Sequence, residues 1–169
     1  DGHLSLDNGM YKLHIARNFI SRKSHNLLLD NTLASMGAGL PSGIALKILY
    51  PERKVVVVTG DGGVMMTIAE LETAVRLKIN LVILVLDDKG YGMIRWKQKD
   101  TSLPAFGLSF DNPDFVMLAE SFGAIGHKIE KAEDLENTLR GTLNAKGVHL
   151  IACPINYEKA NELLKLKLG

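Results

Sequence analysis

Four short apolar runs, separated by stretches with helical spacing, constrain the fold of this chain more than any other feature. The runs cover residues 26–29, 54–59, 81–86 and 149–153, and polar residues or glycine bound them. Runs this short and continuous are typical of strands that are buried on both faces of a parallel sheet. Strands that alternate with helices form βαβ units with right-handed crossovers. We therefore predict an α/β fold with a doubly wound, mainly parallel sheet and helices on both faces.

The stretches between these runs carry the apolar periodicity of amphipathic helices. Apolar side chains recur at spacings of three and four in residues 68–77, 115–122 and 135–143. Asn112 and Pro113 precede the second stretch, where they predict an N-cap followed by a first-turn proline. Three helices are thus expected between the apolar runs.

The composition is that of one globular domain and excludes several classes of partner. The 169 residues suit a single domain, 1–169, that buries a sizeable core. A net charge of +1 gives no reason to expect nucleic acid or an anionic membrane as a partner. No apolar run approaches the roughly 18 residues of a membrane span. Cys153 is the one cysteine and cannot form an internal disulfide, which indicates a reducing, cytoplasmic setting.

The two ends of the chain suggest contacts beyond this domain. Residues 1–4 include no initiator methionine and no signal-peptide pattern, so we expect the chain to be a fragment of a longer protein. Residues 158–168 repeat leucine at spacings of three and four. This pattern predicts an amphipathic helical end that packs on the domain or on a neighbour.

Two acidic turns follow neighbouring apolar runs. The run 54–59 leads into Gly60-Asp61-Gly62-Gly63, where glycine lets the backbone approach an anion and a following helix favours phosphate. Asp61 would repel that phosphate unless a hard cation such as Mg²⁺ lay between them. Asp87-Asp88 ends the next run, and Asp88 follows Asp61 by 27 residues, the length of one helix and one strand. Because ligands of parallel sheets bind at the carboxyl ends of strands, we predict an exposed Mg²⁺ and phosphate site there.

Each turn alone has a simpler interpretation. A Gly-Asp-Gly turn is common, and an aspartate pair after a strand is often only a helix cap or a solvated turn. The glycines lead neither into the Gly-Lys-Ser/Thr of a Walker A motif nor into the spacing of a dinucleotide-binding fingerprint. The argument for a metal site rests on the two turns together.

Residues 60–93 resemble the shared signature of the thiamine-diphosphate enzymes. That signature is Gly-Asp-Gly, then somewhat under thirty residues, then Asn-Asn or a variant. Residues 34–41, 70–78 and 119–124 are similar to the acetolactate synthase branch of the superfamily. The resemblance extends from about Leu6 to Tyr157. It implies the thiamine-diphosphate-binding fold and, for the whole enzyme, decarboxylation of a 2-oxo acid such as pyruvate and transfer of the two-carbon unit to an acceptor carbonyl.

The resemblance also implies roles for individual residues. Asp61 and Asp88 would bind Mg²⁺ through their side chains, and Gly90 through its carbonyl. Met36 would wedge between the two rings of thiamine diphosphate and force its bent shape, although without the family it would be taken for an ordinary core residue. The carbonyl of Ala34 would accept a hydrogen bond from the cofactor's amino group. Backbone N–H groups would hold the diphosphate; the residues around it would be Gly9, Tyr11, Gly60, Gly62, Gly63, Gly92 and Met93.

Three positions depart from the family pattern. The pair Asp87-Asp88 stands in place of Asn-Asn and adds negative charge beside a diphosphate, which predicts a strong dependence on Mg²⁺. Met10-Tyr11 stands where many acetolactate synthases have Gln-His, and of the two only Tyr11 can donate a hydrogen bond. Trp96 resembles the aromatic residue in the substrate region of the catabolic type, whereas in the biosynthetic type the tryptophan would fall one residue later.

The family's activating glutamate has no counterpart here. In the family it belongs to a separate pyrimidine-binding domain contributed by the partner subunit, so we expect a homo-oligomer, at least a dimer, and no catalytic residue in this chain alone. Met36 and Leu40 are candidates for an exposed apolar surface that meets that domain. Two other interpretations stay open: a split subunit of a 2-oxo-acid decarboxylase or lyase, and a non-catalytic module that binds a nucleotide or the cofactor.

Overall fold

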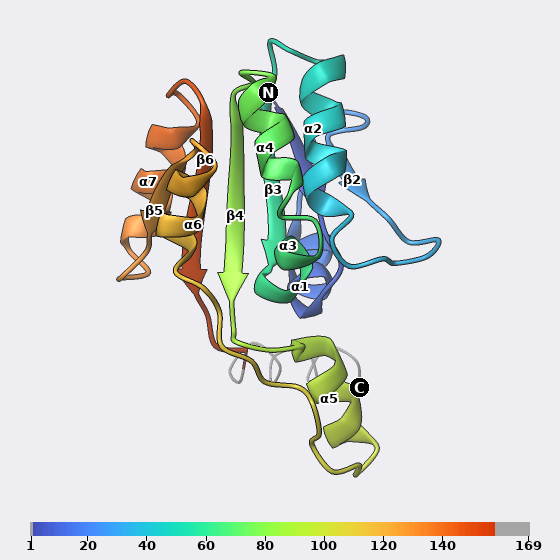
Figure 1. The fold of residues 1–169 in the computed structure, drawn as a ribbon. Coiled ribbons are helices and arrows are strands. Elements are labelled where there is room, and N and C mark those ends of the chain that lie inside the picture. Colours follow the sequence, from blue (N-terminus) through green and yellow to red (C-terminus); the bar gives the residue numbers. More distant parts are fainter. Residues whose placement is uncertain (1, 158–169) are drawn as a thin grey trace.

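A single six-stranded sheet organises the chain. The computed structural model describes residues 2–157, and its strands are ordered β2-β1-β3-β4-β6-β5 with all five pairings parallel (Figure 1). This confirms the predicted α/β class. The strands are β1 (Gly2–Leu6), β2 (Leu27–Leu29), β3 (Lys54–Gly60), β4 (Leu81–Asp87), β5 (Ile125–Lys128) and β6 (Val148–Pro154).

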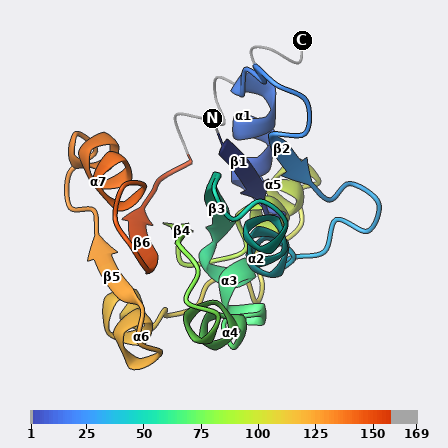
Figure 2. The ribbon, with the colours of Figure 1, turned by 90° about the horizontal axis from the view of Figure 1, so that it is seen from above.

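Helices cover both faces of the sheet, as a doubly wound fold requires. One face packs against α2, α4 and α6, and the other packs against α1 and α7 (Figure 2). The remaining helices, α3 and α5, lie at the carboxyl ends of the central strands (Figure 1). The helices are α1 (Met10–Asn18), α2 (Gly39–Leu49), α3 (Asp61–Met66), α4 (Glu70–Arg76), α5 (Gly92–Asp100), α6 (Phe115–Ser121) and α7 (Asp134–Thr142).

The central strand β4 shows why these sequences form strands. Its side chains alternate between the two layers: Ile83 and Val85 pack in the core under α2, α4 and α6, and Val82 and Leu84 pack in the core under α1 and α7. Both sets are buried. A strand between two helical layers needs β-branched and aliphatic residues at every position, which is the continuous apolar run that the sequence contains.

The run at residues 26–29 behaves differently from the other three. It forms β2 at the edge of the sheet, where Leu28 is 42% exposed, so the expectation of burial on both faces is wrong there. Two strands carried no apolar run and were not predicted. β1 buries the polar side chains of His3 and Ser5, and β5 is a short, half-exposed edge strand.

The predicted N-cap of the 115–122 helix is also wrong. α6 is capped by Asp114, whose Oδ1 accepts hydrogen bonds from the backbone N–H groups of Val116 (2.9 Å) and Met117 (3.1 Å). Asn112 points elsewhere because two carboxylates attract its amide group. Asp and Asn cap helices about equally well, so the local sequence could not decide between them.

Two further expectations concern the surroundings of the sheet. Leu40 is only 1% exposed in the core beneath α2, so its proposed place on an exposed apolar surface is wrong. The helix expected at residues 158–168 lies outside the described residues. Between residues 2 and 157 no helix combines the length and the apolar character that crossing a membrane requires.

Close packing of α2 on β3 depends on a glycine. A β-carbon at Gly43 would lie 2.1 Å from Cγ2 of Val57, a β-branched side chain that is fully buried and has no room to move. Gly141 in α7 is also helical, but a β-carbon there would meet nothing within 4 Å. Substituting alanine at both glycines therefore distinguishes the effect of packing, which differs between the two sites, from the effect of helix propensity, which is the same.

We expect Gly43→Ala to destabilise the fold by about 1–3 kcal/mol, because overpacking a full core forces strained side chains. Gly141→Ala should stabilise it by up to about 1 kcal/mol, because alanine is the better helix former and has free space. Urea unfolding of both variants measures the difference. Equal effects of the two substitutions would show that α2 is not packed as described.

Candidate functional site

The candidate site lies at the point in the sheet where two neighbouring strands lead into helices on opposite faces. β1 leads into α1 on one face, whereas its neighbour β3 leads into α3 and α4 toward the opposite face. Loops that diverge in this way leave a crevice at the carboxyl ends of the strands, which is where open α/β sheets bind ligands. The loop after β4 completes the crevice.

Eleven predicted site residues line one pocket in this crevice. Ala34 and Trp96 do not line it, whereas Asn8, Met10, Tyr91, Ile94 and Tyr157 line it without having been predicted. The structure thus brings most of the predicted set together from separate parts of the chain, and the roles of these residues stay predictions. The eleven are Gly9, Tyr11, Met36, Gly60, Asp61, Gly62, Gly63, Asp88, Gly90, Gly92 and Met93.

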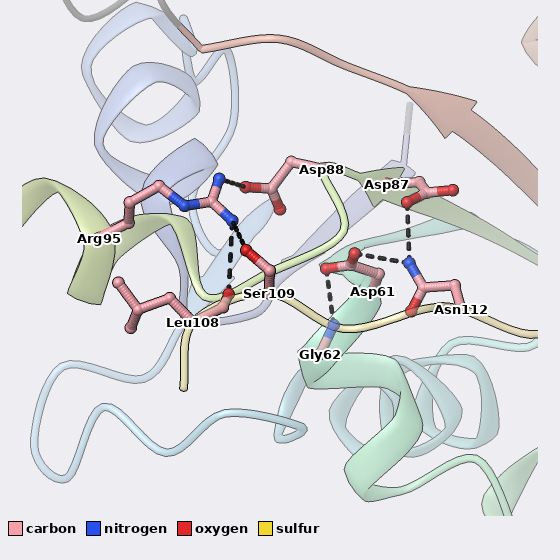
Figure 3. A network of polar contacts seen from close by, with 8 residues as sticks. All are labelled: Asp61, Gly62, Asp87, Asp88, Arg95, Leu108, Ser109 and Asn112. Carbon is pink, nitrogen blue, oxygen red and sulfur yellow. Dashed lines mark hydrogen bonds and ion pairs between the residues drawn. The ribbon is translucent and has the colours of Figure 1, made fainter. Parts of the chain in front are cut away.

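Asp61 is the first residue of α3 and is buried, with 1% of its surface exposed. Its Oδ1 accepts a hydrogen bond from the N–H of Gly62 (2.7 Å), and its Oδ2 accepts one from Nδ2 of Asn112 (2.7 Å) (Figure 3). The expectation of an exposed carboxylate is therefore wrong, because the segment before α6 covers it. The Gly62 N–H, expected to hold a diphosphate, is already occupied by this carboxylate.

The two aspartates at the end of β4 differ in their surroundings. Oδ1 of Asp87 accepts a hydrogen bond from Nδ2 of Asn112 (2.8 Å), and Asp87 does not line the pocket. Asp88 does line it, and its buried Oδ2 has no hydrogen-bond partner among the described residues. The nearest positive charge is the guanidinium of Arg95, with an N–O distance of 3.7 Å (Figure 3).

Electrostatics make Asp88 an unusual carboxyl group. Its pKa is raised to about 6, first because burial disfavours the charged form and then because of the negative charge of Asp61, with Arg95 acting in the opposite direction. A carboxylate oxygen that makes no hydrogen bond and lies beside a second carboxylate is a site that a cation would stabilise. Perturbed groups of this kind cluster at functional sites.

Glycines keep side chains out of the pocket. A β-carbon at Gly62 would lie 2.9 Å from the ring of Tyr91, and one at Gly92 would lie 2.8 Å from Oδ2 of Asp88. A β-carbon at Gly90 would lie 2.3 Å from the carbonyl oxygen of Leu108. Only bare backbone fits at these positions, which lets a ligand approach the main chain closely.

Hydrogen bonds on both sides of Met36 fix the segment that carries it. Gly37 has a φ of +85°, its N–H donates to Oδ2 of Asp7 (3.0 Å), and its carbonyl accepts from the hydroxyl of Thr67 (2.9 Å). Nδ2 of Asn8 donates to the carbonyl of Ser35 (2.8 Å) on the other side of Met36. These contacts hold Met36 at the pocket wall.

Two tyrosines complete the pocket. The hydroxyl of Tyr11 is buried and makes no hydrogen bond of normal geometry, and its pKa is raised by burial and by the charge of Asp7. The pKa of Tyr157 is likewise raised, by burial and then by the charges of Asp88 and Asp61. Both side chains therefore stay neutral and can donate a hydrogen bond.

Three polar residues that the sequence analysis missed share one feature. Asp7 and Asn8 directly follow β1, and Tyr157 follows β6. They lie just beyond a strand end, like Asp61 and Asp88, but no glycine-rich or acidic motif marks them. A search for polar residues after every strand would have found Tyr157, because the run at 149–153 was recognised.

Comparisons with known proteins point to one family. The family model for "Thiamine pyrophosphate enzyme, C-terminal TPP binding domain" matches residues 7–153. The catabolic acetolactate synthase of Raoultella terrigena is 38% identical over 97% of this chain and 29% of its own length. The acetolactate synthase of Bacillus subtilis is 36% identical, over 99% and 30%. The large subunit of acetolactate synthase isozyme 2 of Escherichia coli is 32% identical, over 90% and 28%. The chain thus spans less than a third of the length of these relatives.

The raised pKa of Asp88 predicts a pH-dependent stability. Because the folded pKa (about 6) exceeds the ordinary value of 3.8, the folded state holds the proton more tightly, and this stabilisation is full below pH 3.8 and lost as the pH rises through 6. Asp88→Asn should therefore stabilise the cation-free protein at pH 7.5 by about 1–2 kcal/mol, less than the shift alone implies because solvent screens the site.

At pH 4 the same substitution should have almost no effect. Urea unfolding without divalent cations, at several values between pH 4 and 7.5, measures the difference. Asp111→Asn makes the same change on an exposed side chain and serves as the control. Equal stabilisation at pH 4 and 7.5, or a loss of stability at pH 7.5, would contradict the assignment of strain to Asp88.

Proposed function

The chain belongs to the thiamine pyrophosphate enzymes, as their C-terminal TPP binding domain, and we propose that its pocket holds the cofactor's diphosphate through a Mg²⁺ ion bound by Asp61 and Asp88. One observation carries the proposal: Oδ2 of Asp88 is buried in the pocket without a hydrogen-bond partner among residues 2–157, beside a second buried carboxylate. A cation would offset the negative charge of both.

The donor atoms suit Mg²⁺. This ion prefers oxygen and is usually held by one or two carboxylates together with phosphate oxygens and water. Asp61 and Asp88 would supply the carboxylates, and the carbonyl of Gly90 would supply a third protein oxygen. The cation would also reverse the electrostatic cost of Asp88, because a positive charge favours its ionised form.

The remaining pocket residues would hold the cofactor. Bare backbone at Gly62, Gly63 and the Gly92-Met93 turn would bind the diphosphate, with the Gly62 N–H exchanging Oδ1 of Asp61 for a phosphate oxygen while Oδ2 of Asp61 stays bonded to Asn112. Gly9 and Gly60 would leave room for it, and the neutral Tyr11 hydroxyl would donate to it. A thiamine cofactor supplies carbanion stabilisation through its ylid, and the protein positions it.

Met36 would set the shape of the cofactor. Its segment is pinned on both sides, so the side chain would press between the two rings with little freedom to yield. Ala34 has a φ of 50° and lies outside the pocket wall, at the start of this segment, where its carbonyl would face the cofactor's amino group. Trp96 in α5 would belong to the substrate region, at the edge of the pocket.

For the whole protein we propose an acetolactate synthase-like reaction. It would decarboxylate a 2-oxo acid such as pyruvate and transfer the two-carbon unit to an acceptor carbonyl, which with two pyruvates gives acetolactate. The names of the similar proteins support this proposal. It requires a pyrimidine-binding domain, from the same protein or a partner subunit, and a homo-oligomer of at least two chains. The buried, free thiol of Cys153 is compatible with the cytoplasm.

The assignment of Asp61 as a metal ligand predicts that Asp61→Ala loses cofactor binding but keeps the fold. Thiamine pyrophosphate should no longer be retained by the full protein in the presence of Mg²⁺, with an affinity lower by tenfold or more. The fold should persist, although Asp61 is buried, because its removal also relieves repulsion at Asp88. Calorimetric titration of the cofactor into the full protein with excess Mg²⁺ measures the affinity.

Asp111→Ala removes a nearby exposed carboxylate and is the matched control, with affinity expected to equal that of the unmodified protein. An Asp61→Ala protein that binds the cofactor as tightly as this control would rule out Asp61 as a ligand.

The chain alone should fold without turning over pyruvate. Among residues 2–157 the pocket is lined by two carboxylates, Asp61 and Asp88, and both lie at the proposed metal end. No acid is therefore placed to protonate the far ring of the cofactor. Pyruvate consumption by the purified 169-residue chain with excess cofactor and Mg²⁺ tests this expectation. Clear turnover without any second polypeptide would show that an activating acid is present in the chain.

A further inference from the structure

One side chain connects the loops that carry the acidic residues. Asn112, in the segment between α5 and α6, donates through Nδ2 to Oδ2 of Asp61 (2.7 Å) and to Oδ1 of Asp87 (2.8 Å) (Figure 3). The two acceptors lie at the ends of adjacent strands, where Gly60 of β3 pairs with Leu86 of β4. An amide nitrogen has two hydrogens, so this group uses its full donor capacity on the two carboxylates.

The position between Asp61 and Asp87 requires a hydrogen-bond donor that carries no charge. Two carboxylates at adjacent strand ends repel each other, and a lysine or arginine between them would neutralise the charge that a cation requires. Neither Asp61 nor Asp87 forms an ion pair with Lys or Arg within the described part of the chain. Asn112 satisfies one oxygen of each carboxylate and adds no positive charge, so Asp61 keeps its attraction for a metal.

The same contact separates the two aspartates of the pair. Asp87 is tied to Asn112, and the two residues line a different cavity, on the side of β4 and β6. Asp88 is left to line the cofactor pocket, with its Oδ2 making no hydrogen bond among the described residues and lying 3.7 Å from the guanidinium of Arg95. Which of the two aspartates lines the pocket is thus associated with Asn112, which lies 24 positions after Asp88.

We propose that Asn112 is a positioning residue for the cation: it holds Asp61 in the orientation that a metal needs and keeps Asp87 out of the pocket. The inference rests on the proposed Mg²⁺ site. Groups that orient metal ligands through hydrogen bonds commonly change metal affinity by 10- to 100-fold when they are removed. Asn112 touches neither the cofactor nor its reacting atoms in this account, and it acts through Asp61.

The test measures metal binding directly and does not depend on activity. Mn²⁺ serves as the probe, and electron paramagnetic resonance follows the loss of the free-ion signal when it is titrated into the full protein with saturating thiamine pyrophosphate. We expect Asn112→Ala to weaken Mn²⁺ binding about tenfold or more. Asn112→Leu, which keeps the bulk of the side chain but donates no hydrogen bond, should weaken it equally and remains informative if the alanine variant does not fold.

Asp114→Ala is the control for a purely structural effect. It removes the N-cap of α6 two residues away, at a cost of about 1 kcal/mol, and the hydrogen bonds of the Asp114 carboxylate go to backbone N–H groups of α6. It should lower the thermal midpoint and leave Mn²⁺ affinity unchanged. Mn²⁺ affinity of the Asn112 variants within twofold of the unmodified protein, or an equal loss in Asp114→Ala, would overturn the inference.

A double-mutant cycle with Asp87→Ala separates the two parts of the role. If Asn112 acts partly by restraining Asp87, the effect of Asn112→Ala on Mn²⁺ affinity should shrink when Asp87 is already absent. Strict additivity would contradict that part of the inference. Failure of the unmodified protein to bind Mn²⁺ with the cofactor would instead refute the proposed metal site, so the two proposals fail in different ways.

Discussion

Two carboxylates at adjacent strand ends, the buried Asp61 and the half-buried Asp88, are the constraint around which the carboxyl edge of this sheet is built. Asp61 and Asp88 line one pocket, and burial together with mutual repulsion makes the charged form of Asp88 costly. A chain folded for stability alone would avoid this arrangement. The neighbouring residues reduce the cost without removing the charge: Asn112 donates to Asp61, and Arg95 lies 3.7 Å from Asp88. The proposed cation would account for why this cost is kept.

The parallel sheet supplies the geometry for this pair. β3 and β4 run side by side, so the residues that follow them emerge at one edge although a helical crossover separates them in sequence. Glycines at the same edge bring bare backbone to the pocket, and the pinned Met36 segment closes it from the side of α2. In the proposed function the chain would provide the half of a cofactor site that binds the diphosphate and sets the cofactor's shape, and the activating acid would come from elsewhere.

The sequence predicted the parts of this structure that depend on local pattern. The continuous apolar run of β4 is typical of a strand covered on both faces, and the glycines around Asp61 lie where a β-carbon would come within 3.0 Å of a neighbouring side chain. The parts that failed depend on tertiary partners. Asn112 has the local pattern of a helix cap, and only the approach of Asp61 and Asp87 redirects its amide. The burial of Asp61 could not be foreseen either, because the covering segment lies about fifty residues away in the chain.

The position of the cation tests the central claim most directly. Crystals of the full protein grown with thiamine pyrophosphate and Mn²⁺ would give an anomalous difference peak at the metal. The account predicts one peak about 2–2.5 Å from a carboxylate oxygen of Asp61 and from one of Asp88, with the diphosphate on its other side and Asp87 still bonded to Asn112. A peak coordinated by Asp87 in place of Asp88, or a bound diphosphate with no metal between it and Asp61, would contradict it.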